Sequence, residues 1–176
     1  MCKLFIKKLK TKLLFTALII LPLGQVHSAI ADIEQQIVIK SKRQASDLKN
    51  KIASYLDDVE ITQGSLSIKA DIVQVVSQAH TDNKIYIASG KPAIFKQLLD
   101  DGKPINLQAN QIKYEPAKHL ITISGNASVS QEGSLVSGNI IIYNTLTEQL
   151  TAESKSDSDE SVTTILQPQL KEKNNP

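Results

Sequence analysis

The chain lacks tryptophan, has one cysteine (Cys2) and one arginine (Arg43), and aromatic residues make up only 4% of its 176 residues. A single cysteine cannot staple the fold through an internal disulfide, so burial must stabilise it. Scarce arginine and a nearly balanced charge exclude the clustered positive charge that nucleic acid binding requires. The remaining apolar content is mostly aliphatic and largely β-branched, which favours strands.

The first 31 residues have the three regions of a secretory signal peptide. Five lysines precede the apolar run Leu13–Leu23, and Ala29-Ile30-Ala31 provides a small-residue cleavage site. The run is shorter than the ~20 residues that span a bilayer. We therefore expect a signal peptide at 1–31, cleaved after Ala31 or, alternatively, after Ala29. Its removal leaves 15 basic and 18 acidic residues, a net charge of −3.

A short apolar pattern recurs every 34 residues. Its three copies are Val59-x-Ile61-x-Gln63, Ala93-x-Phe95-x-Gln97 and Ala127-x-Val129-x-Gln131. A second pattern interleaves with it and opens at Ala70-Asp71, Ala109-Asn110 and Gly138-Asn139, where we expect the chain to turn a corner. The middle copy carries an extra turn at 100–104. Such periodicity is typical of stacked units, none of which can bury its apolar face alone.

Apolar residues alternate with polar ones from Ile37 onward, and no stretch after the signal sustains a helical period for three turns. The sequence therefore predicts an all-β domain over residues 32–168, with about 14–16 short strands and a flexible polar tail at 169–176. Alternating strands bury one face only, so the sheet must fold over on itself as a sandwich, roll or barrel.

The alternation selects a set of inward-facing side chains. We expect this set to comprise Ile37, Ile39, Val59, Ile61, Leu66, Ile68, Val73, Val75, Phe95, Leu107, Ile112, Tyr114, Ile121, Ile123, Val129, Leu135, Ile141 and Tyr143. These side chains either fill a dry core or line an apolar binding surface. Periodicity alone leaves both interpretations open.

Catalytic and metal-binding patterns are missing from the sequence. His80 and His119 lie in polar turns and have no carboxylates at the spacing typical of a metal site. The adjacent pairs Asp57-Asp58 and Asp100-Asp101 do not have the spacing of a catalytic dyad. The acidic segment 152–161 lacks the central glycine and flanking helices of an EF-hand. We expect no enzyme activity, no metal site and no cofactor.

Several strings are similar to those of the OstA-like (LptA) family of periplasmic lipopolysaccharide-transport proteins. The most specific are Gly90-Lys-Pro-Ala-Ile-Phe95 and Asp101-Gly-Lys-Pro104, and the similarity extends over nearly the whole chain after the signal. The resemblance implies an antiparallel β-jellyroll, folded into a V-shaped, open-ended trough that holds the acyl chains of lipid A. It implies that Ile37 and Ile39 lie at the lipid-receiving end, and that Phe95 and Tyr114 contact lipid inside.

On this basis we expect a lipid-binding interior. Its residues are Ile37, Ile39, Val59, Ile61, Ile68, Val73, Phe95, Ile112, Tyr114, Ile123, Val129, Ile141 and Tyr143. The implied partners are lipopolysaccharide, an inner-membrane-anchored LptC-like protein, an outer-membrane LptD-like translocon and further copies of this chain stacked head to tail. Docking edges are expected near Ile37 and near 162–166. A structural β-module without lipid, a polysaccharide enzyme on a repeat scaffold and an uncleaved inner-membrane homologue are alternatives.

Overall fold

The computed structural model describes residues 32–78, 81, 83–155 and 161–167. The predicted signal peptide and the predicted tail lie outside these residues. The elements are β1 (Val38–Lys40), β2 (Arg43–Asp47), β3 (Ile52–Gln63), β4 (Leu66–Ser77), β5 (Lys84–Leu98), β6 (Pro104–Glu115), the 3-10 helix η1 (Pro116–Lys118), β7 (Leu120–Gln131), β8 (Ser134–Asn144), β9 (Leu150–Glu153) and β10 (Thr163–Ile165). In the described part of the chain, no helix is long and apolar enough to cross a membrane.

All ten strands belong to one antiparallel sheet, in which β3 to β8 pair in sequence order. Two-residue turns join β3 to β4 and β7 to β8, η1 lies between β6 and β7, and the β5–β6 connection contains the extra turn expected at 100–104. The sheet is open, with β1 and β2 pairing β3 at one end and β9 and β10 pairing β8 at the other. The prediction of an antiparallel all-β fold is confirmed.

Each of the long strands β3 to β8 bends near its middle. The pairing register shifts there, for example between Lys69 and Ile72 in β4 and between Gln108 and Gln111 in β6, as at a β-bulge. Ala70-Asp71 and Ala109-Asn110 lie within these shifts, so the expected corners are present. Backbone pairing nevertheless continues on both sides of every bend. The described residues therefore form ten strands, instead of the 14–16 short ones expected, because two predicted strands join into one.

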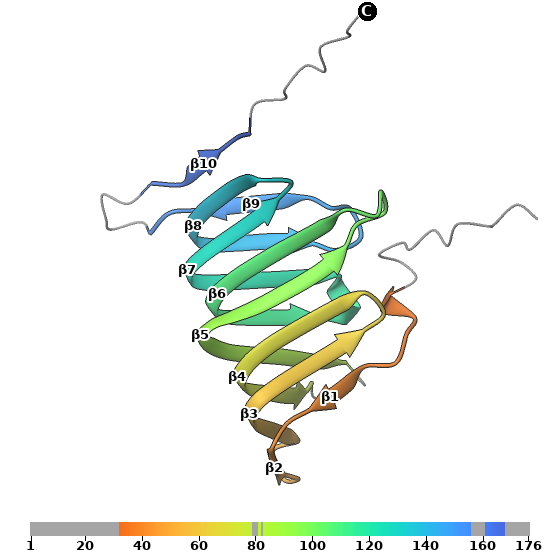
Figure 1. Cartoon of the computed structure of the whole chain (residues 1–176). Helices are drawn as coiled ribbons and strands as arrows, with labels where there is room; N and C mark the ends of the chain where they lie inside the picture. The colour runs from red at the N-terminus through yellow and green to blue at the C-terminus, as the bar shows by residue number, and fades with distance from the viewer. Residues whose placement is uncertain (1–31, 79–80, 82, 156–160, 168–176) are drawn as a thin grey trace, which may run out of the picture.

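The bends divide the sheet into two facing walls, which give the V shape (Figure 1). The first wall contains β1, β10 and the strand halves 59–63, 66–70, 93–98, 104–109, 127–131 and 134–138. The second wall contains β2, β9 and the halves 52–56, 72–77, 84–89, 111–115, 120–124 and 140–144. In Figure 1 the bends lie on the left, and the open side of the V, called the mouth below, lies on the right.

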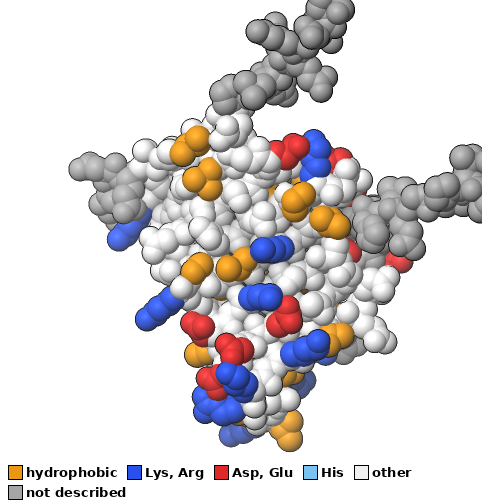
Figure 2. All heavy atoms as spheres, viewed as in Figure 1, with side chains coloured by type: hydrophobic (Ala, Val, Ile, Leu, Met, Phe, Trp, Pro, Cys, Tyr) orange, Lys and Arg blue, Asp and Glu red, His pale blue; other side chains and the backbone are white. Residues whose placement is uncertain are grey.

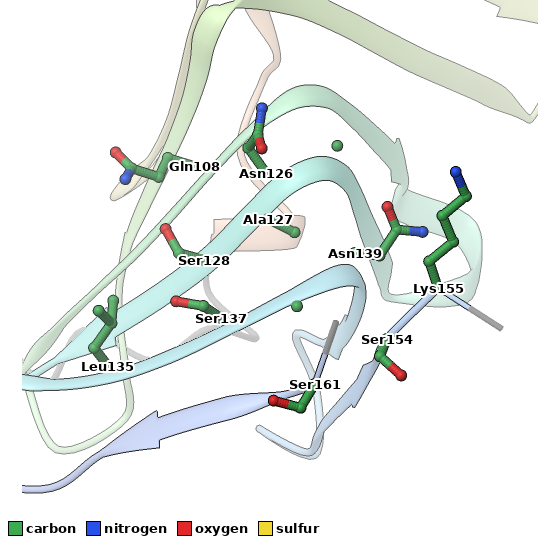
Figure 3. A pocket seen from close by; sticks show the side chains of 12 residues that line it. Gln108, Asn126, Ala127, Ser128, Leu135, Ser137, Asn139, Ser154, Lys155 and Ser161 are labelled. Carbon is green, nitrogen blue, oxygen red and sulfur yellow. The ribbon is translucent and has the colours of Figure 1, made fainter. Parts of the chain in front are cut away.

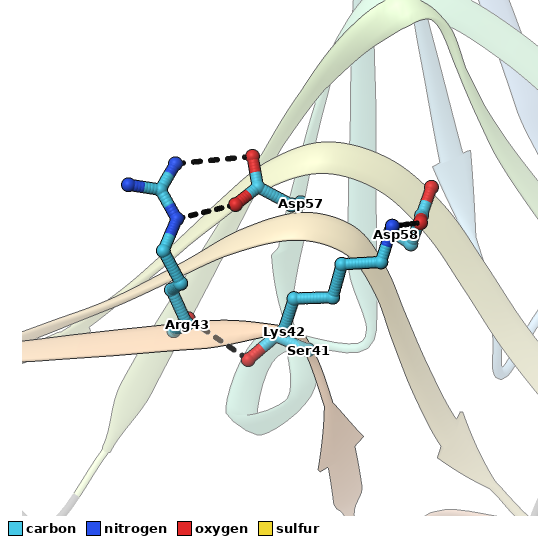
Figure 4. A network of polar contacts seen from close by, with 5 residues as sticks. All are labelled: Ser41, Lys42, Arg43, Asp57 and Asp58. Atoms are coloured by element: carbon cyan, nitrogen blue, oxygen red, sulfur yellow. Dashed lines mark hydrogen bonds and ion pairs between the residues drawn. The ribbon is translucent and has the colours of Figure 1, made fainter.

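Charged side chains mark the break between β1 and β2 (Figure 4). Arg43 donates from Nε and Nη2 to the two carboxylate oxygens of Asp57, at 2.5 and 3.1 Å, and Lys42 pairs with Asp58. Asp57 and Asp58 both have positive φ, at 63° and 49°, where β3 bends. The hydrogen bond from Arg43 lowers the pKa of the Asp57 carboxyl. The edge strand is therefore divided where its neighbour turns, so that each wall receives one short piece.

The inner faces of the walls align into three apolar rungs that run across the sheet. The first-wall rung is Ile39–Ile61–Ile68–Phe95–Leu107–Val129–Val136. The two second-wall rungs are Tyr55–Val73–Ala88–Ile112–Ile123–Ile141–Ala152 and Ala53–Val75–Tyr86–Tyr114–Ile121–Tyr143–Leu150. The 34-residue repeat thus places Ile61, Phe95 and Val129 at equivalent heights on one wall.

Two of the differences between the inward set and the expectation have the same cause. Leu135 is directly opposite Ser130 on the outer face, whereas Val136 pairs with the buried Val129 and packs against the core. Tyr86 is buried, although it was absent from the predicted set. Both segments carry neighbouring apolar residues on opposite faces, so alternation alone cannot choose the buried one.

The outer surface contrasts with this interior. Figure 2 shows one side of it, which is mainly polar, with hydrophobic side chains in small separate spots and charged side chains gathered at the end of β2 and β3. The sheet therefore has one apolar face, which is turned inward along its whole length.

Candidate functional site

The structure brings the predicted lipid-binding residues together on the inner face of the V. All except Ile37 and Ile39 are buried, and Ile61, Ile68, Val73, Phe95, Ile112, Ile123 and Ile141 have no exposed surface. Ile37 and Ile39 are half-buried and pack against the same cluster. The interior is therefore filled by its own side chains. A ligand can contact the central residues only when the two walls separate.

A cleft at the β1 end leads into this interior. It measures about 610 Å³, and its apolar lining consists of Ile37 and Ile39 on one side and Tyr55, Val75 and Tyr86 on the other. The predicted lipid-receiving residues thus lie where the interior opens at one end of the sheet. Beyond the cleft, the ring of Tyr86 packs against that of Tyr114, with centroids 5.9 Å apart and planes inclined at 33°. This contact closes the apolar path on the second wall.

A buried polar network, called the mouth network below, ties the chain before β1 across the edge of the first wall. The Asp32 carboxylate accepts hydrogen bonds from the backbone N–H of Ser65 at 2.7 Å, from the Ser65 hydroxyl and from the Gln97 amide at 3.2 Å. The Gln63 amide donates to the carbonyls of Ile33 and Gln35. Asp32, Gln63 and Gln97 are each no more than 5% exposed.

One bond of this network crosses from wall to wall. The Tyr114 hydroxyl, on the second wall, donates to Oε1 of Gln63, on the first wall, at 3.0 Å. Burial raises the pKa of Tyr114 far above its ordinary value, so the hydroxyl stays protonated and able to donate. The mouth is therefore closed by a neutral hydrogen bond, which can break without leaving a buried charge on either wall.

Glycine is required in the turn between β3 and β4, next to the mouth network. Gly64 has a φ of +59°, and a Cβ at this position would lie only 2.1 Å from Oδ1 of Asp32. The absence of a side chain thus allows Asp32 to reach the Ser65 N–H. Gln63 and Gln97 each end one copy of the 34-residue repeat, and this equivalence could have indicated a shared structural role. Asp32 carried no such signal.

A second hollow lies outside the V, over the bends of β7 and β8 (Figure 3). It measures about 620 Å³, and amide and hydroxyl side chains dominate its lining, including Gln108, Asn126 and Ser137. Leu135 also faces it, which agrees with the outward position of this residue. Such a lining does not suit acyl chains, because its polar groups would lose their hydrogen bonds to water. The apolar interior is therefore the candidate site.

The chain matches a known family model over this sheet. The family is described as LptA/(LptD N-terminal domain) LPS transport protein, and its model covers residues 38–149. The chain belongs to this family. The family's description names LPS transport, and the matched range contains both walls from β1 to the end of β8.

Individual members of the LptA family are similar over most of the chain. The lipopolysaccharide export system protein LptA of Haemophilus influenzae is 34% identical over 164 residues, which cover 92% of this chain and 94% of that protein. The protein of the same name from Escherichia coli K12 is 38% identical over 146 residues, with coverage of 82% and 78%.

A solved structure has the same architecture. It is the crystal structure of LptH from Pseudomonas aeruginosa, described as the LptA homologous periplasmic component of the conserved lipopolysaccharide transport device. It superposes with a TM-score of 0.71 at 25% identity, covering 78% of this chain and 99% of that one. The open, bent antiparallel sheet is therefore shared with another family member.

Proposed function

We propose that the protein carries lipopolysaccharide across the periplasm by holding the acyl chains of lipid A between its two walls. The observation that supports this proposal most strongly is the continuous apolar inner face. Each of the three rungs spans seven strands of the sheet, and a cleft lined by Ile37 and Ile39 opens at one end. Membership of an LPS transport family points to lipopolysaccharide as the ligand, and the apolar rungs offer a surface that suits its acyl chains.

The rungs suit transport better than storage because equivalent positions repeat along the sheet. Each buried methylene contributes about 0.8 kcal/mol, so several acyl chains bind without any specific polar contact. Ile61, Phe95 and Val129 then offer similar apolar contacts at successive places along one wall. Lipid would pass between them without leaving a deep pocket. The walls must part first, because these side chains are buried in the core of the V.

Partners are proposed to dock at the two ends of the sheet. β1 and β2 form one edge and β9 and β10 the other, and an exposed edge templates pairing with another strand. Val38 at the first edge and Ile165 and Leu166 at the second are exposed apolar side chains. An LptC-like protein would add to the first edge, an LptD-like translocon to the second, and further copies of this chain head to tail between them.

Photo-crosslinking tests the proposal. A benzophenone side chain replaces Phe95 inside the trough and, as the matched control, Leu135 on the outer face. In cells with radiolabelled lipopolysaccharide, we expect adducts from position 95 and none from 135. Adducts from neither position, in a protein that still pairs with its partners, would instead favour a structural β-module. The closed interior fits that second candidate as well, so the experiment decides between the two.

A further inference from the structure

Cationic and hydroxyl side chains lie at the mouth, beside the rung of the second wall that contains Ala53, Val75 and Tyr86. Ser77 and Lys84 are direct partners between β4 and β5, and the backbone N–H of Ser77 donates to the carbonyl of Lys51 at 3.1 Å. Ser77 is two residues beyond Val75, and Lys84 is two residues before Tyr86. Since strand side chains alternate, Ser77 and Lys84 share the inner face with the rungs.

These three residues, Lys51, Ser77 and Lys84, line one cleft. Lys51, Ser77 and Lys84 surround a hollow of about 320 Å³, whose apolar floor includes Ala53, Tyr55 and Val75. Tyr55, Val75 and Lys84 also line the larger cleft that opens into the interior. Apolar residues thus lead inward from a cationic rim, which is the arrangement that an amphiphile with an anionic head group requires.

Some of the described lysines are engaged by carboxylates, and the two lysines of the rim are not. Lys42, Lys69, Lys103, Lys113 and Lys118 each form an ion pair with a carboxylate. Among the described residues, Lys51 and Lys84 form none. Asp47 also lines the cleft, but its carboxylate accepts hydrogen bonds from the backbone and side-chain amides of Asn50, at 3.0 and 2.7 Å. Two ammonium groups on one rim therefore have no carboxylate partner in the described part of the chain.

We infer that Lys51, Ser77 and Lys84 form a subsite for a phosphate group of lipid A, at the end of the trough where its acyl chains enter. The inference rests on the proposed function, which supplies the acyl chains. Lysine ammonium groups and a serine hydroxyl bind phosphate oxygens through charge-assisted hydrogen bonds. Because all three lie beyond the apolar rungs, the phosphate stays at the water boundary while the chains pass inward. The subsite would select lipids that carry an anionic head.

Binding of two lipids tests this subsite. Radiolabelled lipid A with both phosphates is compared with the same lipid after enzymatic dephosphorylation, in a nonionic detergent. The double variant Lys51→Met and Lys84→Met keeps the long apolar stems and removes both charges. The matched control is Lys91→Met with Lys96→Met, two exposed lysines elsewhere on β5. We expect the first variant to bind phosphorylated lipid A about tenfold more weakly, with unchanged binding of the dephosphorylated lipid and an unaffected control.

Three results would overturn the inference. Equal binding of both lipids by the wild type would show that phosphate is not read, while leaving the acyl-binding function intact. An equal loss for both lipids in the double variant would assign the lysines to the fold. Displacement of lipid A by millimolar inorganic phosphate would identify a free-anion site instead. If the wild type bound neither lipid, the proposed function itself would fail.

Discussion

Asp32 is the residue whose removal most directly tests the mouth network. Its carboxylate accepts three hydrogen bonds, two from Ser65 and one from Gln97, and it is 5% exposed. A hydrogen bond to a charged group contributes about 1.5–3 kcal/mol. The three bonds share one acceptor group and are not additive, so we expect Asp32→Ala to lower the free energy of unfolding by about 3 kcal/mol.

Two measurements check this value. For a domain of this size, a loss of about 3 kcal/mol lowers Tm by roughly 10 °C, which calorimetry resolves. Hydrogen exchange at the Ser65 amide should accelerate, because that N–H donates directly to Asp32. Asp32→Asn keeps one acceptor oxygen and should cost about half as much. Asp71→Ala, at an exposed position in the bend of β4, is the control and should stay within about 0.5 kcal/mol of the wild type.

A loss of stability smaller than about 1 kcal/mol, together with unchanged exchange at Ser65, would refute this role of Asp32. That result would mean that the segment before β1 is held by something other than the Asp32 carboxylate. Faster exchange at Ser65 without a loss of stability would assign Asp32 to local order only. Either outcome would show that the mouth network does not hold the mouth closed.

Three further predictions follow from buried groups. Tyr143→Phe should be neutral or stabilising by about 1 kcal/mol in urea unfolding, because the buried Tyr143 hydroxyl has no hydrogen-bond partner among the described residues, whereas Tyr114→Phe should destabilise by a similar amount. Phe95→Ala should cost about 3–5 kcal/mol in the same assay, since Phe95 has no exposed surface; a cost below 1 kcal/mol would contradict close packing of the walls. Hydrogen bonds from Lys113 and Lys118 lower the pKa of Glu115, so its contribution is present above its unfolded pKa and is lost as pH falls through the folded one. Glu115→Gln should therefore be less stable than the wild type at pH 7 by roughly 1 kcal/mol and nearly equal to it at pH 3, and a constant difference would exclude this linkage.

The sequence predicted the rungs because their physical signal is local. Ile61, Phe95 and Val129 follow from alternation and from the 34-residue period, and both properties survive in the aligned strands. The strand count was too high because a bulge and a chain reversal use the same small and polar residues. Leu135 was assigned to the wrong face because Val136 beside it is equally apolar, and the register of the β7–β8 hairpin decides between them.

The mouth network and the cationic rim were outside the reach of local patterns. The Tyr114–Gln63 bond joins residues 51 apart, and the Gln97–Asp32 bond joins residues 65 apart. Such contacts depend on how the two walls face each other, which no strand pattern contains. Lys84 is likewise an ordinary lysine in the sequence, and it becomes notable only where its strand ends beside the apolar floor of a cleft.

If lipid enters only when the two walls separate, then linking the walls across the mouth should block its entry. Cysteines at Gln63 and Tyr114, on opposite walls, are joined by a short bis-maleimide, and cysteines at Glu60 and Lys69, paired on the outer face of one wall, serve as the control. Lipopolysaccharide crosslinking is then measured from a benzophenone at position 95. We expect the protein with the linked mouth to lose the adduct and the control to retain it. An undiminished adduct in the protein with the linked mouth would show that lipid enters without separation of the walls.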